Sequence, residues 1–227
     1  MSSYVSLFLK TLFNKLPSIA PPFFKTLFAC VKGITIILLL NALPVLAVAQ
    51  EQSLNYSINR HGKQVGKLNF KQVKLGSKTT YAIESDVKAS MILSFHVQVK
   101  ENSVYENDVL QYSSLNRQVN GKERANQQIK NNGTGLSVTE DGEETILKNF
   151  VVKYNTHCLY AQEPTFYTSV FSDNYKLFIP IKKIKEHHYK ISFPDGNSNE
   201  YVYENGSCKL IKVRTSLFNA DFVLNKP

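Results

Sequence analysis

The stretch that decides the fold is HYKISFPDGNSNEYVYENGSCKLIKVRT, residues 188–215. Apolar and polar residues alternate along three short runs, which are separated by Pro-Asp-Gly-Asn at residues 194–197 and by Asn205-Gly206. Asp-Gly and Asn-Gly favour tight hairpin turns, because both central positions of a type I′ turn need a positive φ. The pattern therefore predicts three consecutive strands of an antiparallel meander.

The same alternation continues through the rest of the chain from Leu54. Its β-runs are interrupted every eight to fourteen residues by turn sequences, and no long segment has the 3.6-residue period of an amphipathic helix. Strands that are adjacent in sequence tend to pair, and a sheet of roughly ten strands tends to curl. We therefore predict an all-β fold, an antiparallel meander that forms a strongly curved sheet or an open or closed barrel. The turn sequences lie at Gly62, Gly76, Asn107-Asp108, Asn120-Gly121, Asn132-Gly133 and Asp141-Gly142.

Two segments differ from this pattern. Residues 117–144 are polar, so their strands have little core to cover and are expected at an edge of the sheet. Residues 149–180 are rich in Phe and Tyr, and we expect this segment to cover an open side of the sheet. Within it, Pro164 is expected to begin a short helix, because proline is well tolerated in a first turn.

The N-terminal part predicts export. An apolar run begins at Gly33 after Lys32, and the small-x-small sequence Ala47-Val48-Ala49 ends it. This arrangement is typical of a secretory signal peptide cleaved after Ala49. An uncut anchor is the alternative, and it would also leave the following domain outside the cytoplasm. We therefore divide the chain into a leader, residues 1–49, and a single antiparallel β domain, residues 50–227, exported to the periplasm, the cell envelope or the exterior.

Charge argues against nucleic acid as a partner. The formal net charge is +9, but the leader contributes four lysines and no acid. Residues 50–227 therefore carry 23 basic and 18 acidic side chains, a balance of +5 without an arginine cluster. Nucleic-acid-binding domains concentrate basic residues on one face. We expect membrane contact only through the leader or at the envelope surface.

No motif for a nucleophile, a phosphate loop or a metal site occurs in the sequence. The five histidines are scattered, and we interpret them as surface or strand-end residues. The adjacent His187 and His188 would point to opposite faces of a strand. Glu84 and Asp86 are the nearest pair of acids on one strand face, which we interpret as a solvated face. The sequence thus assigns no catalytic residue, no metal ligand and no cofactor, and it favours a protein that is not an enzyme.

Cleavage of the leader would leave two cysteines, Cys158 and Cys208. In an oxidising compartment they could form a disulfide between the aromatic segment and the C-terminal meander. Two buried thiols are the equally weighted alternative.

Several short motifs along the chain occur together. They are Tyr56-x-Ile58, Gly62-Lys63-x-Val65-Gly66, residues 92–101, Glu163-Pro164, Ser172-Asp173-Asn174, Phe193-Pro194-x-Gly196-Asn197, Tyr201-x-Tyr203 and Asn205-Gly206. With these motifs the chain resembles a family of secreted all-β proteins of unknown function from Bacteroidetes. The likeness extends from about residue 54 to residue 224 and implies export and an all-β fold, but it implies no catalytic residue.

The leading functional hypothesis is non-catalytic binding of an apolar or amphipathic ligand, such as a lipid or a lipid-linked glycan, by the curved sheet. It depends on the one-sided apolar alternation combined with the aromatic segment. A protein-interaction module of the cell envelope and an enzyme with an unrecognised site are the alternatives. The candidate ligand-binding residues are Tyr160, Phe166, Tyr167, Phe171, Tyr175 and Phe178.

Overall fold

The computed structural model describes residues 49–90, 94–216 and 218–226, so almost all of the predicted leader lies outside the described residues. The described residues form fourteen strands and the short helix α3. These elements are β1 (Gln50–Arg60), β2 (Lys63–Leu75), β3 (Lys78–Ser90), β4 (Ser94–Glu106), β5 (Val109–Val119), β6 (Lys122–Asn131), β7 (Gly135–Glu140), β8 (Glu143–Lys148), α3 (Cys158–Ala161), β9 (Ser169–Ser172), β10 (Leu177–Lys185), β11 (His188–Ser192), β12 (Ser198–Glu204), β13 (Ser207–Arg214) and β14 (Asn219–Leu224).

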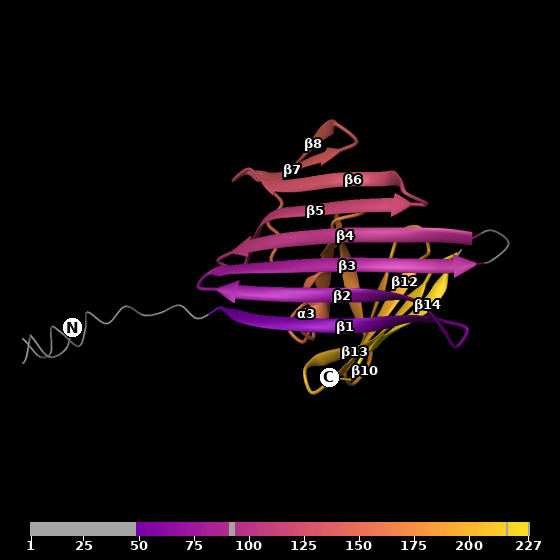
Figure 1. Ribbon diagram of the computed structural model, residues 1–227. Coiled ribbons are helices and arrows are strands. Elements are labelled where there is room, and N and C mark those ends of the chain that lie inside the picture. Colours follow the sequence, from indigo (N-terminus) through magenta and orange to yellow (C-terminus); the bar gives the residue numbers. More distant parts are fainter. Residues whose placement is uncertain (1–48, 91–93, 217, 227) are drawn as a thin grey trace, which may run out of the picture. The chain divides into compact units, whose positions relative to one another are not determined.

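All fourteen strands belong to one sheet, in the order β8-β7-β6-β5-β4-β3-β2-β1-β14-β13-β12-β11-β10-β9. Every pairing in this order is antiparallel. The two halves of the chain are joined where β1 pairs with β14, with Tyr56 opposite Leu224. The sheet curves so that β10–β14 lie behind the long strands β1–β4 in Figure 1. It does not close, because β8 and β9 end the order without pairing with each other.

The predicted all-β meander is therefore confirmed. The three strands expected within residues 188–215 are β11, β12 and β13. Asn205 and Gly206 have φ values of 51° and 74°, as a type I′ turn requires. The sheet has more strands than the roughly ten expected, partly because β9 and the start of β10 lie within the aromatic segment.

The core lies inside the curve of the sheet. Alternate side chains of each long strand point inward, and the largest of those that are fully buried include Tyr56, Phe70 and Tyr201. Tyr160, which lies in the helix α3, stacks on Phe70 with ring centroids 5.5 Å apart. The removal of these apolar faces from water is the main term that favours the folded state.

The aromatic segment differs from its prediction in one respect. Its helix, α3, ends at Ala161 and precedes Pro164. The helix packs inside the sheet, where the hydroxyl of Tyr203 donates a hydrogen bond to the carbonyl of Leu159 at 2.6 Å. The same segment also covers the edge of β9, because the amide of Phe171 donates to the carbonyl of Tyr154 at 2.9 Å. The free edge of β9, which could otherwise pair with a strand of a second chain, is thereby occupied.

The polar segment, residues 117–144, lies towards the other end of the strand order, as expected. The expectation that its strands cover little core is wrong, because Ile129, Leu136 and Val138 are each at most 2% exposed. Leu136 and Val138 are two residues apart on β7, and Ile129 lies opposite Val138 on β6, so the two strands still present one buried face.

Gly66 marks a close approach of two strands. It lies opposite Ile58, next to the point where the register of β1 and β2 shifts. A Cβ added at Gly66 would lie 2.4 Å from the carbonyl oxygen of Asp86 and 2.9 Å from the Cα of Val87. Both atoms belong to the backbone of β3, so no side-chain rotation relieves the contact.

We expect Gly66→Ala to lower the free energy of unfolding by about 1–3 kcal/mol, because β2 and β3 must move apart to admit the methyl group. Urea denaturation measures this change as a lower midpoint at constant slope. Lys67→Ala, at the exposed neighbouring position, is the control and should change the free energy by less than about 0.5 kcal/mol. Equal stability of Gly66→Ala and the wild type would contradict the close approach.

Candidate functional site

A cavity of about 430 Å³ opens on the inner side of the curved sheet. Its walls come from β4, β5 and β12, from the segment around α3 and from the loops at residues 172–175 and 193–197. Twelve of the seventeen lining residues are polar or charged, four are aromatic and one is Leu115. A volume of this size lies within the ordinary range of small-molecule sites, roughly 300–1,000 Å³.

The pairing register of β4 and β5 determines which side chains form the polar wall of this cavity. Glu101 lies directly opposite Leu115, and Ser103 lies opposite Ser113. Arg117 is two residues beyond Leu115, so it projects from the same face of the sheet. These residues continue the inward face that Val97 begins, so β4 changes along its length from an apolar to a polar inner face.

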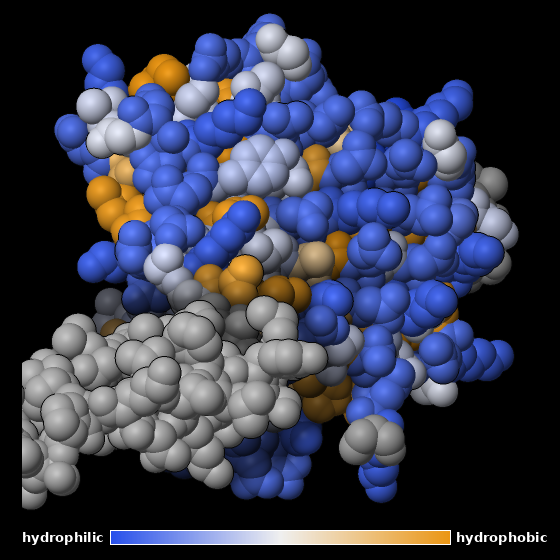
Figure 2. Space-filling model, turned by 60° about the vertical axis from the view of Figure 1, so that its left-hand side comes forward, coloured by the Kyte–Doolittle hydropathy of each residue, from blue (hydrophilic) through white to orange (hydrophobic). Residues whose placement is uncertain are grey.

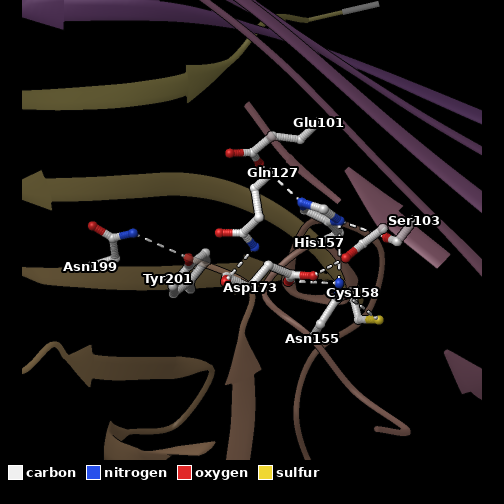
Figure 3. A network of polar contacts seen from close by, with 10 residues as sticks. Glu101, Ser103, Gln127, Asn155, His157, Cys158, Asp173, Asn199 and Tyr201 are labelled. Atoms are coloured by element: carbon white, nitrogen blue, oxygen red, sulfur yellow. Dashed lines mark hydrogen bonds and ion pairs between the residues drawn. The ribbon is translucent and has the colours of Figure 1, made fainter. Parts of the chain in front are cut away.

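His157 is the centre of a buried polar network (Figure 3). Its Nε2 lies 3.0 Å from Oε2 of Glu101, and its Nδ1 lies 2.6 Å from Oγ of Ser103. The side-chain nitrogen of Asn155 is 3.3 Å from the same Nδ1. His157 is only 3% exposed. The sequence-based interpretation of a lone histidine at the surface or at a strand end is therefore wrong for His157.

Asp173 extends the network beyond β9. The hydroxyl of Ser113 donates to Oδ1 of Asp173 at 2.5 Å, and the side-chain Nδ2 of Asn155 donates to Oδ2 of Asp173 at 3.0 Å. Gln127 of β6 donates from Nε2 to the backbone carbonyl of Asp173 at 2.8 Å. These bonds fasten the loop after β9 to strands β5 and β6, so the two ends of the unclosed sheet are linked through side chains.

The buried ionisable groups shift one another's pKa values. Burial works to neutralise His157, but the hydrogen bond and the negative charge of Glu101 outweigh it and raise the pKa of the imidazole. Burial likewise opposes ionisation of Glu101, and the bond to His157 outweighs it and holds the pKa of the carboxyl below its usual value. Burial raises the pKa of Asp173. Glu101 and His157 therefore form a charged pair at the inner wall of the cavity.

The positions of Glu101, His157 and Ser103 relative to the cavity argue against nucleophilic catalysis by Ser103. Serine, histidine and carboxylate are in hydrogen-bond contact, as in a catalytic triad, but a triad needs its serine at the substrate. Ser103 is 0% exposed and does not line the cavity, whereas Glu101 and His157 do. The carboxylate thus faces the cavity and the serine lies behind it, so the network presents an acceptor and holds no nucleophile towards a ligand.

The six aromatic residues proposed from the sequence are dispersed. Tyr160 and Tyr175 line the cavity. Phe171 is fully buried in the core, whereas Phe166 is 89% exposed and Phe178 is 42% exposed. Tyr167 lies elsewhere and stacks on Tyr154, with ring centroids 4.0 Å apart. The structure therefore brings two of the six to the cavity.

The residues that sequence reasoning missed are Glu101, Ser103, Ser113, Arg117, His157 and Asp173. A signal for two of them was present, because Glu101 and Ser103 occupy the same alternate positions of β4 as the inward-facing Val97 and Val99. A polar residue on the apolar face of a strand must find a partner or water. No comparable signal marked His157, whose partners on β4, Glu101 and Ser103, lie more than fifty residues away.

The disulfide left open by the sequence does not form. Cys158 and Cys208 are both free, buried thiols. Cys158 lies 3.4 Å from Oδ1 of Asn155 and Cys208 lies 3.9 Å from the carbonyl of Leu210, so each sulfur has separate neighbours. Burial raises the pKa of Cys158 to about 11 and that of Cys208 to about 12. Neither thiol is an activated nucleophile.

Within the described part of the chain, no group of three or more His, Cys, Asp or Glu side chains is arranged to hold a metal ion. The described residues contain no helix that combines the length and the apolar character needed to span a membrane. The acids Glu84 and Asp86 lie on the outer face, where Asp86 is 2.9 Å from His96 and Glu84 is 3.8 Å from Lys100.

Comparison with known proteins gives a family. The family model described as Domain of unknown function (DUF6134) matches residues 56–225. Among solved structures, the chain is similar to a beta-barrel-like protein of Domain of Unknown Function DUF1849 from Brucella abortus, with 12% sequence identity and a TM-score of 0.45. That similarity covers 79% of this chain and 97% of the other. No curated protein matches the sequence.

We expect the stability of the fold to fall as the pH rises through the pKa of His157. The pKa of folded His157 is above 6.5, so its contribution is complete below that pH and is lost at higher pH. The pKa of folded Glu101 is below 4.5, so its contribution is complete above that pH and is lost in acid. The pair therefore stabilises the fold most between pH 4.5 and 6.5.

His157→Gln breaks this buried pair and should cost about 3–5 kcal/mol at mildly acidic pH, and less at alkaline pH. Urea denaturation at both pH values measures the difference. His61→Asn, at an exposed turn, is the control, because Asn tolerates the positive φ of 48° there. A cost of His157→Gln that is the same at both pH values would contradict a charged pair.

We expect Cys158 and Cys208 to react with a thiol reagent only after unfolding, because both are buried and protonated. Unfolding in denaturant without a reductant should release two reactive thiols from residues 50–227. Absorbance of the released chromophore measures this number. A mass two hydrogens lower, with no reactive thiol in that part of the chain, would show a disulfide instead.

Proposed function

We propose that this chain, which belongs to the family of domains of unknown function DUF6134, binds a small amphipathic molecule in the cavity of its curved sheet and catalyses no reaction on it. The observation that carries the proposal is the cavity itself, where aromatic rings and hydrogen-bonding groups from distant parts of the chain converge on about 430 Å³. Such a combination orients a ligand through a few polar groups and holds it through apolar contact.

The wall chemistry favours a ligand with a substantial polar part. A lipid chain alone would place an apolar surface against twelve polar or charged residues and would replace none of the water that their remaining hydrogen-bonding groups lose. The aromatic members, among them Tyr160 and Tyr175, supply the apolar contact. The ligand we propose is therefore amphipathic, as the polar end of a lipid-linked molecule is, and not purely apolar.

Export fits this function. The signal-like sequence that ends at Ala49, and the likeness to secreted proteins of Bacteroidetes, support a place in the periplasm, the cell envelope or outside the cell. A binding domain there would meet envelope components and nutrients.

A second candidate, a protein-interaction module, is favoured by exposed apolar side chains near the β9 end of the sheet. Val151 is 60% exposed and Phe166 is 89% exposed. Phe178, 42% exposed, stacks on Phe150 with ring centroids 5.9 Å apart. The face drawn in Figure 2 carries its hydrophobic side chains in small separate groups among hydrophilic ones. Large continuous apolar patches are the usual mark of partner surfaces, so cavity binding remains the first proposal.

Native mass spectrometry of the full chain, purified gently from cells that make it, tests the proposal. We expect a mass above that of the polypeptide, which is lost on denaturation and identifies the ligand. A bare polypeptide mass at every purification step would contradict ligand binding and favour the interaction module.

A matched pair of variants locates the binding. Asn199→Phe fills the cavity, because Asn199 lines it from β12. Val202→Phe adds a ring of the same size to the other face of the same strand. We expect Asn199→Phe to lose the added mass and Val202→Phe to keep it. Loss in both variants, or in neither, would place the ligand elsewhere.

A further inference from the structure

We propose that the cavity holds a hydroxylated sugar ring between the Glu101 carboxylate and the Arg117 guanidinium. This inference rests on the proposed function and names the chemical class of its ligand. The argument depends on which polar atoms of the cavity wall are already satisfied by the protein and which are not.

Glu101 offers an unused acceptor. Its Oε2 is held by His157 at 3.0 Å, but within the described residues its Oε1 takes part in no hydrogen bond. The side chain is 28% exposed and lines the cavity, so this oxygen is reachable by a ligand. The bond to His157 also fixes the orientation of the carboxylate, which lowers the entropy cost of binding.

Arg117 offers unused donors. Its side chain lines the cavity, and it forms no hydrogen bond or ion pair with any other described residue. Arg214 shows the contrast, since its guanidinium donates to the carbonyls of Val213 and Ala220 and lies 2.8 Å from Asp221. A guanidinium has five N–H donors and no acceptor. At Arg117 all of them are available to a ligand.

The other acids of the cavity are already satisfied. Asp173 accepts bonds from Ser113 and Asn155, and Asp195 accepts bonds from Tyr175 and from Asn197. The free acceptor and the free donors are therefore concentrated at Glu101 and Arg117. Their strand positions are diagonal neighbours on one face, a relation that separates two residues by about 7–8 Å, with the Cβ atoms somewhat closer.

Hydroxyl groups match this pair. A hydroxyl can donate to the carboxylate and accept from the guanidinium, and neighbouring hydroxyls on a ring can do both at once. Tyr175 and Phe193 add a flat apolar surface at the cavity wall, stacked at 5.2 Å with an interplanar angle of 22°. The C–H face of a sugar ring can lie against such a surface while its hydroxyls reach the charged pair. A purely apolar ligand would leave Oε1 of Glu101 and the N–H groups of Arg117 without a hydrogen-bond partner.

An array of immobilised mono- and oligosaccharides, probed with the purified full chain, tests the inference. We expect at least one saccharide to be bound, and saturation-transfer NMR with that free saccharide to show contact along one face of its ring. Arg117→Gln should weaken the affinity about ten- to one-hundredfold, because hydrogen bonds to a charged group are lost. Arg124→Gln on β6, which does not line the cavity, is the control and should bind as the wild type does.

Glu101→Ala should also abolish binding, but loss of the His157 partner can unfold the protein. Arg117 forms no hydrogen bond or ion pair with another described residue, so Arg117→Gln keeps the test valid, and circular dichroism confirms that it is folded. Wild-type affinity in Arg117→Gln would overturn the inference. Binding of free amino acids or short peptides in place of every saccharide would also overturn it.

Native mass spectrometry separates the inference from the proposed function. A ligand mass that is not a saccharide, with no array binding, would leave cavity binding intact and overturn the sugar. A bare polypeptide with no array binding would overturn both. A saccharide recovered from the purified protein would support both.

Discussion

The pairing of β1 with β14 is the contact on which the rest of the structure depends. It joins a meander of eight strands to a meander of six, and only after it forms does one continuous sheet exist. The curve of that sheet then brings β4 and β5 to face β12 and encloses α3. The cavity has walls from both halves, so its formation depends on a contact made far from it. This dependence explains why the site is a property of the whole sheet and not of a local motif.

The charged network both stabilises the fold and would contact the proposed ligand. His157 and Asp173 come from the segments around α3 and β9, whereas Glu101 and Ser113 come from the opposite wall. The bonds between them hold the unclosed end of the sheet in place. They also leave one carboxylate oxygen of Glu101 facing the cavity. A buried charged pair is a weak source of net stability, but it fixes a unique arrangement of the groups that carry it.

The strands could be predicted from the sequence because their signals are local. Period-two alternation and the turns at Asn120-Gly121 and Asn205-Gly206 specify strands and hairpins without reference to the rest of the chain. The site could not be predicted, because its bonds join residues distant in sequence, as Ser103 and His157 are by 54 positions. The six aromatic candidates were not all at the cavity, because the position of each depends on distant parts of the chain. An aromatic side chain favours burial without specifying whether it fills a core, lines a cavity or remains outside.

The large sequence separation between β1 and β14 also affects the order in which the sheet folds. Ser57 and Asn225, which are bonded across this pair, are 168 positions apart, and closing such a loop costs about 2–3 kcal/mol more entropy than closing a ten-residue hairpin. Each meander can assemble from hairpins before the two meet, so contact order assigns their docking to a late step. Until then β1 and β14 expose free edges that match the corresponding edges of a second molecule. At high concentration during refolding, exchange of whole meanders between chains therefore competes with docking inside one chain.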